Sequence, residues 1–236
     1  MNEMVRAEGL SAVYNEKDEK PVLDGLDFSV REGERIALMG ANGAGKSTLL
    51  LTLTGVLLPQ KGALVVNGIP VKKENLRELR RSCGLVFQNP DDQIFMPTVE
   101  DDVSFGPRNY GMDEAEIKER VEKILASLGV GELKGRLAHH LSGGEKRLAA
   151  LAGILVMEPV LLLLDEPLAF LDPAARRRLI AVLEELPQTM ILSTHDGDMA
   201  RGFCSRCIIL RKGRICADGP AGEILACPDR LLQWGL

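Results

Sequence analysis

The 236-residue chain lacks an apolar run long enough to cross a bilayer. A spanning helix needs about 18 or more consecutive apolar residues, and the apolar runs here are shorter. The first residues also lack the long apolar core of a secretory signal and include an acid at Glu3. These absences argue against an integral membrane or secreted protein and predict a chain that folds in water.

An excess of basic residues is also absent. The chain has 29 Lys and Arg against 34 Asp and Glu, which gives a formal net charge of -5. Proteins that bind nucleic acid usually carry a basic stripe, so the composition argues against such a partner. The hydrophobic share of 45% is ordinary for a globular protein and supports a sizeable core in one domain, or in one core with a lobe.

Cysteine is sparse and odd in number, with five residues in the chain. This count does not suggest a secreted disulfide framework, and a reducing compartment is the simpler interpretation. Cys204 and Cys207 form a C-x-x-C, but no second pair with zinc-site spacing accompanies it. We expect buried structural thiols.

A glycine-rich stretch at 40–48 fits G-x-x-x-x-G-K-[ST] at every fixed position. Its context fits too, because 35–39 is typical of a short buried strand and 48–53 of a helix whose N-terminus favours an anion. Such a loop points backbone N–H groups, a lysine and a hydroxyl at phosphates. The predicted nucleotide-binding residues are Gly40, Ala41, Asn42, Gly43, Ala44, Gly45, Lys46, Ser47 and Thr48.

Polar side chains follow three other apolar runs. Gln88 follows 84–87, Asp165 and Glu166 follow 160–164, and His195 follows 190–194. In a mostly parallel sheet, ligands bind beyond the carboxyl ends of the strands. We therefore expect these side chains to converge with Lys46 on one site.

The remaining pattern predicts two additions to this core. Asn67-Gly68 between apolar segments is a strong hairpin signal and indicates an antiparallel sheet. Helical periodicity dominates the middle of the chain, for example at 117–128. The prediction is a core with an antiparallel β part at 1–88 and 158–236, and a helical subdomain inserted at 89–157.

In this order, the motifs resemble the ATP-binding subunits of ATP-binding cassette (ABC) transporters over nearly the whole chain. The distinguishing element is Leu141-Ser142-Gly143-Gly144-Glu145, since other phosphate-loop ATPases lack it. The stretch 87–107 is most similar to energy-coupling factor ATPases, especially those of cobalt and nickel importers. The resemblance implies an α/β fold with a RecA-like phosphate-loop core, and 1–236 as one nucleotide-binding domain.

The resemblance also implies a role for each site residue. Lys46 and the loop amides would hold the β- and γ-phosphates of ATP, and Glu166 would polarise the attacking water. Mg²⁺ would be coordinated by Ser47, Gln88 and Asp165. His195 would bond the γ-phosphate, and Tyr14 would stack on adenine, although a strand tyrosine is often only packing. Ser142, Gly143 and Gly144 would contact the ATP of a partner subunit, and Asp172, which could be only a helix cap, would contact that partner too.

The function implied is ATP hydrolysis that powers import of cobalt or nickel through a membrane energy-coupling factor complex. The partners would be a second copy or a similar ATPase, a membrane coupling subunit and a substrate-binding membrane subunit. The chain would then lie peripherally on the cytoplasmic face of the cell membrane. Apolar residues in 89–111 could receive helices of the membrane subunit, or could simply close the helical lobe.

Three alternatives remain. The first is the ATPase of a vitamin importer or of another ABC transporter. The second is a soluble chromosome-maintenance or translation ATPase, although no heptads are visible between Lys46 and Leu141. The third is a nucleotide-gated binding protein without turnover, which would lack a base where Glu166 stands.

Overall fold

The computed structural model describes residues 2–15 and 20–235. Contacts divide the chain into two compact units. The first comprises Met1–Leu85, Val160–Glu166 and Pro187–Leu236, and the second comprises Val86–Pro159 and Pro167–Leu186.

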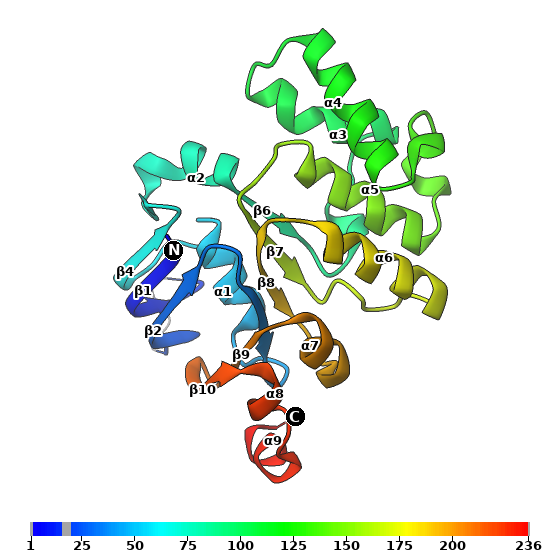
Figure 1. Ribbon diagram of the computed structural model, residues 1–236. Helices are drawn as coiled ribbons and strands as arrows, with labels where there is room; N and C mark the ends of the chain where they lie inside the picture. The colour runs from blue at the N-terminus through cyan, green and yellow to red at the C-terminus, as the bar shows by residue number, and fades with distance from the viewer. Residues whose placement is uncertain (1, 16–19, 236) are drawn as a thin grey trace. The chain divides into compact units, whose positions relative to one another are not determined.

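The first unit contains a six-stranded sheet in the order β10-β9-β3-β8-β7-β6 (Figure 1). β3 pairs in parallel with β8 and β9, and β7 pairs in parallel with β8. Every residue of β7 and β8 is buried, as expected for strands that are covered on both faces. The strands are β3 (Arg35–Met39), β6 (Cys83–Val86), β7 (Leu161–Asp165), β8 (Thr189–Ser193), β9 (Arg206–Arg211) and β10 (Arg214–Pro220).

A four-stranded antiparallel sheet, in the order β2-β1-β4-β5, also belongs to the first unit. Asn67 and Gly68 both have positive φ angles, 49° and 74°, which is the backbone that a two-residue hairpin turn requires. The predicted hairpin is thus confirmed. The strands are β1 (Glu3–Ala12), β2 (Leu23–Arg31), β4 (Lys61–Val66) and β5 (Ile69–Pro70).

Short helices complete the first unit. α1 is the next element after β3, and the loop at 40–45 joins the two. The helices are α1 (Lys46–Leu53), α2 (Leu76–Ser82), α7 (Gly197–Phe203), α8 (Ala221–Ile224) and α9 (Pro228–Trp234), with a 3-10 turn η1 (Lys73–Asn75). None of the helices in the described part of the chain is long and apolar enough to span a bilayer.

The second unit is helical, as predicted, with α3, α4 and α5 packed against one another (Figure 1, green). Ile117, Val121 and Leu125 on α4 are buried, so the 3.6-residue periodicity identified the core face. Its elements are α3 (Val99–Asn109), α4 (Glu114–Ser127), α5 (Gly143–Leu155) and α6 (Pro173–Glu185), and the 3-10 turns η2 (Pro90–Asp92), η3 (Gly131–Leu133) and η4 (Ala138–His140).

The division differs from the sequence prediction at α6, because contacts group 167–186 with the helical unit and not with the core. The reason is close packing of α6 on α5. A Cβ atom added to Gly144 would lie 2.9 Å from the Cβ atom of Ala175. The surface that carries Ser142 and the surface that carries Asp172 therefore belong to the same unit.

Candidate functional site

The phosphate loop lies between the end of β3 and the start of α1. Gly40 has a φ of 148°, and a Cβ atom there would lie 2.2 Å from the carbonyl oxygen of Leu210, so only glycine fits. Gly45, with a φ of 108°, is the N-cap of α1 and offers no side chain to the helix start. The first N–H groups of α1 are thus left for an anion.

Lys46 is a nearly buried cation, with 8% of its surface exposed. Its Nζ atom donates to the carbonyl oxygen of Gly40 at 2.8 Å and lies 3.1 Å from Nε2 of His195. Burial lowers the pKa of Lys46, while the charges of Glu166 and Asp165 oppose that shift. A buried ammonium of this kind favours anionic ligands, because an added negative charge offsets the cost of its desolvation.

Two carboxylates are brought to the same sheet edge by β7. Asp165 pairs in register with Ser193, the last residue of β8. The hydroxyl of Ser193 donates to Oδ1 of Asp165 at 2.5 Å and accepts the backbone N–H of Glu166 at 2.9 Å. Ser193 is fully buried. One serine therefore fixes both the Asp165 side chain and the turn that carries Glu166.

Sequence reasoning missed Ser193. The feature that could have identified it is a polar residue at the end of the buried strand β8, paired in register with Asp165 at the end of β7. Reading that signal required the strand pairing, which the sequence alone does not provide.

Glu166 and His195 face each other in the described structure, with Oε1 and Nε2 3.2 Å apart. Oε1 is buried and makes no hydrogen bond, although the imidazole is within ion-pair distance. The backbone of Glu166 has a φ of 44°, an uncommon conformation for a residue with a side chain. Burial raises the pKa of Glu166, while His195 and Lys46 oppose that shift. The arrangement favours a carboxylate that accepts a proton more readily than an exposed glutamate.

Tyr14 lies beside the loop, and its hydroxyl is 3.0 Å from Oγ1 of Thr48. The tyrosine is 55% exposed, so its ring is open to a ligand. Ser47, adjacent to Thr48, is exposed as well. The first unit thus brings Asp165, Glu166 and His195 together with Lys46, as the strand ends predict, while a contact of Tyr14 with adenine stays a prediction.

The glycine cradle, which a Cβ atom at Gly40 would fill, fits the phosphates of a nucleoside triphosphate bound with a magnesium ion. For the phosphates, this unit offers backbone N–H groups and a lysine as hydrogen-bond donors. For the metal, it offers a hydroxyl and a carboxylate as oxygen ligands. Oxygen ligands are the kind that Mg²⁺ prefers.

Gln88 belongs to the second unit, where it follows β6 and is exposed. Arg147 on α5 holds its main chain. The guanidinium donates to the carbonyl oxygens of Phe87 and Gln88, both at 2.5 Å, and only 2% of the arginine is exposed. Sequence reasoning missed Arg147, since an arginine on a helix is normally exposed.

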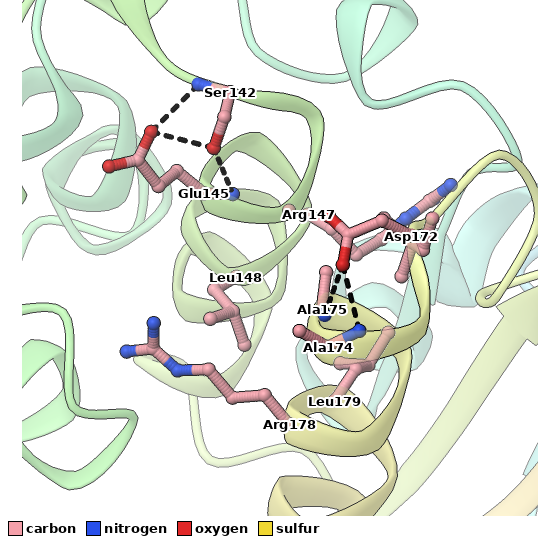
Figure 2. A pocket seen from close by; sticks show the side chains of 11 residues that line it. Ser142, Glu145, Arg147, Leu148, Asp172, Ala174, Ala175, Arg178 and Leu179 are labelled. Atoms are coloured by element: carbon pink, nitrogen blue, oxygen red, sulfur yellow. Dashed lines mark hydrogen bonds between the residues drawn. The ribbon is translucent and has the colours of Figure 1, made fainter.

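The glycine-rich start of α5 forms a surface of the second unit (Figure 2). The Ser142 hydroxyl accepts the backbone N–H of Glu145, and the Glu145 carboxylate accepts the backbone N–H of Ser142 at 2.7 Å. This reciprocal pair is a capping box, which satisfies two backbone N–H groups at the start of α5. Arg136 also pairs with Glu145, at 3.1 Å.

Asp172 caps α6 by accepting the N–H groups of Ala174 and Ala175 (Figure 2). Together with Ser142 and Gly144 it lines a pocket of about 250 Å³. The cap that the sequence left open as an alternative role for Asp172 is therefore present. A role in subunit contact stays a prediction.

The C-x-x-C is buried, as expected. Cys204 is 6% exposed and Cys207 is fully buried, and burial raises the pKa of each thiol to about 12. Within residues 2–15 and 20–235 no group of three His, Cys, Asp or Glu side chains is placed to hold a metal ion. The thiols act as small apolar side chains of the core.

A glycine-rich loop between a parallel strand and a helix, with a lysine, two carboxylates and a histidine at one sheet edge, defines a phosphate-loop nucleotide-binding protein. Residues 23–169 match the ABC transporter family. The chain belongs to the ABC transporter family and is an ATP-binding, ATP-hydrolysing subunit of it.

Curated relatives agree with this assignment. The chain is 49% identical over 225 residues to a putative ABC transporter ATP-binding protein of Streptomyces avermitilis, covering 95% of this chain and 85% of the relative. It is 48% identical over 215 residues to the energy-coupling factor transporter ATP-binding protein EcfA of Methanoculleus marisnigri, covering 89% and 78%. The chain is thus of the energy-coupling factor type.

Solved structures confirm the fold. CbiO1 of Clostridium perfringens, described as part of the ABC transporter complex cbiONQ, matches with a TM-score of 0.86 and 36% identity, covering 99% of this chain and 94% of that one. A dimeric ATP-binding cassette, MJ0796, in a post-hydrolysis state with ADP and phosphate, matches with a TM-score of 0.81 and 26% identity, covering 92% and 99%.

Replacing Ser193 with alanine tests the hydroxyl that fixes both carboxylates. We expect Ser193→Ala to lower kcat for ATP hydrolysis about tenfold or more, because partners of this kind orient a metal-binding carboxylate. Ser104→Ala is the matched control, since Ser104 is also buried and its hydroxyl donates to the carbonyl oxygen of Glu100 at 2.6 Å. Steady-state kinetics and urea unfolding of both variants give the comparison. Equal kcat values in the two variants would show that Ser193 serves stability alone.

Proposed function

We propose that this subunit powers the import of a transition-metal ion, cobalt or nickel, through a membrane energy-coupling factor complex. The observation that carries the proposal is the likeness to CbiO1 over 99% of this chain, together with the resemblance of the 87–107 stretch to metal importers. In this proposal the chain lies on the cytoplasmic face of the membrane and acts through membrane partners.

The proposed hydrolytic roles follow from the geometry of the first unit. Lys46 and the loop amides hold the outer phosphates, and the Lys46 charge neutralises the leaving group. Glu166 accepts a hydrogen bond from the attacking water and orients it, while His195 bonds the γ-phosphate. Tyr14 covers the adenine. A bound Mg²⁺ would supply positive charge that stabilises the negative charge developing on the phosphates.

We propose three metal-binding side chains. Two of them, Ser47 and Asp165, belong to the first unit, and the third, Gln88, belongs to the second unit. Ser47 offers an exposed hydroxyl, and the hydrogen bond from Ser193 holds the Asp165 carboxylate in one orientation. The backbone of Gln88 is fixed by Arg147.

We propose that the ATPase works as a dimer, either of two copies or with a similar subunit. The start of α5 offers a second set of anion-binding groups, namely the N–H groups and hydroxyl of Ser142, Gly143 and Gly144. One triphosphate does not need two such sets in one chain. In a twofold dimer each subunit completes the site of the other, and ATP binds across the interface.

The surface proposed for the membrane subunit comprises the segment before α3 and an exposed part of α3 itself. Phe95 and Phe105 form an edge-to-face pair with ring centroids 4.7 Å apart, and they are 64% and 39% exposed. The two rings lie at the surface, while Val99 and Val103 of the same segment are fully buried and close the helical core, so we base the proposed docking on the rings alone. Exposed aromatic side chains beside polar groups are typical of interaction sites.

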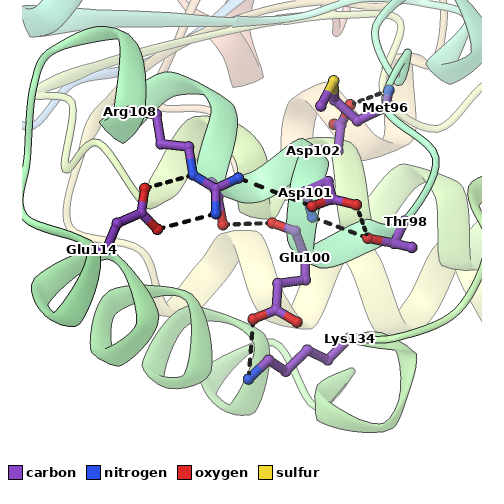
Figure 3. A network of polar contacts seen from close by, with 9 residues as sticks. Met96, Thr98, Glu100, Asp101, Asp102, Arg108, Glu114 and Lys134 are labelled. Carbon is purple, nitrogen blue, oxygen red and sulfur yellow. Dashed lines mark hydrogen bonds and ion pairs between the residues drawn. The ribbon is translucent and has the colours of Figure 1, made fainter.

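A polar network holds this surface in place (Figure 3). Asp102 accepts the backbone N–H groups of Phe95 and Met96 at 3.0 and 3.1 Å. Arg108 donates two hydrogen bonds to Glu114, at 2.9 and 3.1 Å. Asp102 thus fixes the backbone that presents Phe95, and changing its charge would disturb the loop as well as any docking.

Glu166→Gln tests the catalytic base. We expect kcat for ATP hydrolysis to fall about 100-fold or more, which is the usual size of a general acid–base contribution. In the wild type, kcat should rise with pH through the raised pKa of Glu166, because the carboxylate is the active form. The midpoint of this rise in kcat should lie at a higher pH than the ordinary pKa of a glutamate, and the Glu166→Gln variant should show no such rise. Hydrolysis within twofold of wild type would rule out the role.

Phe95→Ser with Phe105→Ser tests the docking surface. We expect the pair to reduce co-purification of the subunit with its membrane partners about tenfold or more, because aromatic anchors dominate many interfaces. ATP binding by the isolated subunit should not change. Val56→Ser is the control, because Val56 is 59% exposed in a different segment. Undiminished assembly of the paired variant would contradict the proposed surface.

Uptake measurements test the cargo. Vesicles with the ATPase and its membrane subunits should accumulate radioactive cobalt or nickel when ATP is supplied, and vesicles with Glu166→Gln should not. Riboflavin and biotin serve as the vitamin alternatives in the same vesicles. ATP-dependent uptake of a vitamin without metal uptake would establish the alternative cargo class.

A further inference from the structure

The turn between β9 and β10 supports one end of the phosphate loop. The backbone N–H of Gly213 in this turn donates to the carbonyl oxygen of Ala44 at 3.0 Å, and the carbonyl oxygen of Gly213 accepts the N–H of Asp24 at 2.9 Å. The turn is therefore held by β2 and in its turn holds the loop. The bond from Gly213 reaches Ala44, next to α1, and not the residues 41–43 before it.

The outer half of the loop, residues 41–43, is reached by Lys46 and by α9. The Nζ atom of Lys46 lies 3.4 Å from the carbonyl oxygen of Ala41, as well as 2.8 Å from that of Gly40. α9 comes from the far end of the chain (Figure 1, red). A Cβ atom added to Gly235, the C-cap of α9, would lie 3.4 Å from the Cβ atom of Ala41, so the end of this helix lies against the loop.

A pocket of about 330 Å³ lies beside this contact. It is lined by Asn42 and Gly43 of the loop, by Leu232 and Trp234 of α9, and by Lys212 of the β9–β10 turn. All of these residues belong to the first unit. Trp234 is half-buried, and it is the only tryptophan of the chain.

α9 is held to the protein by partial contacts. It has seven residues, and none of them is buried. A helix of this length is not stable alone in water, so its order depends on what its side chains and its end touch. Ordering of the helix and ordering of the loop beside it should therefore favour each other.

We propose that Trp234 is a positioning residue for the phosphate loop, and that with Gly235 it holds residues 41–43 in the shape that binds phosphates. The inference rests on the phosphate-binding role proposed for the loop. Phosphates compete for the ammonium donors of Lys46 that reach the carbonyl oxygens of Gly40 and Ala41. When Lys46 turns to the phosphates, the outer half of the loop relies on α9. A loop ordered in advance loses less conformational entropy when it binds.

Trp234→Ala tests the positioning role by calorimetric titration and steady-state kinetics. We expect the Kd values of both ATP and ADP to rise about tenfold, because the loop would be competent to bind for only part of the time. The kcat at saturating ATP should stay within about twofold, since support of the loop favours bound substrate and transition state alike. Trp234→Phe should restore most of the affinity. Arg230→Ala is the control on α9, because Arg230 is exposed and does not line the pocket.

The fluorescence of Trp234 gives a second readout in the wild-type protein. If α9 orders the loop, then filling the loop must order α9 by the same coupling. We expect acrylamide to quench Trp234 less when ADP, or pyrophosphate alone, saturates the protein. Pyrophosphate has no adenine, so its effect would come through the phosphate loop and not through Tyr14. Lys46→Ala should abolish the response to pyrophosphate.

The outcomes distinguish this inference from the proposed function. If Trp234→Ala leaves both Kd values unchanged, the positioning role is wrong and the proposed site stands. If Lys46→Ala binds ATP as tightly as the wild type, the phosphate-binding role fails, and the inference fails with it. If Arg230→Ala weakens binding as much as Trp234→Ala, the effect belongs to α9 in general and the role of Trp234 is overturned. Should Trp234→Ala be unfolded, quenching in the wild type that ADP does not change would overturn the inference.

Discussion

A buried positive charge at Lys46 organises the nucleotide site of this protein. An ammonium group taken out of water is costly unless negative charge or oxygen acceptors surround it. Here the Gly40 carbonyl supplies one acceptor, and Asp165 and Glu166 supply nearby negative charge. Gly40 belongs to the same loop as Lys46, whereas both carboxylates are distant from it in sequence. The site therefore depends on the parallel sheet, which alone brings the ends of β3, β7 and β8 to one edge.

The positions of the principal site residues could be read from the sequence because they belong to short, rigid patterns. The 40–48 stretch has three glycines, and two carboxylates directly follow a buried apolar strand. Such patterns locate binding groups at the carboxyl ends of strands without any knowledge of the packing. The Asn67-Gly68 hairpin was predictable for the same reason, since the turn requires positive φ at both positions.

The supporting residues could not be read in this way. Ser193 acts through strand register, and Arg147 acts through a contact between α5 and a loop sixty residues earlier in the chain. The grouping of α6 with the helical unit likewise follows from side-chain packing between α5 and α6 and not from any local pattern. In each case the information lies in pairs of residues that are distant in sequence.

The two hydrogen bonds from Arg147 have a mechanical consequence. They join α5 to the backbone of Phe87 and Gln88 through a planar group that is almost completely buried. Because a guanidinium fork tolerates little change in angle, the helix and the glutamine must shift together or the arginine must lose both acceptors. The backbone of Phe87 and Gln88 and the helix that begins at Gly143 are thus expected to move as one rigid body, not as two independent parts.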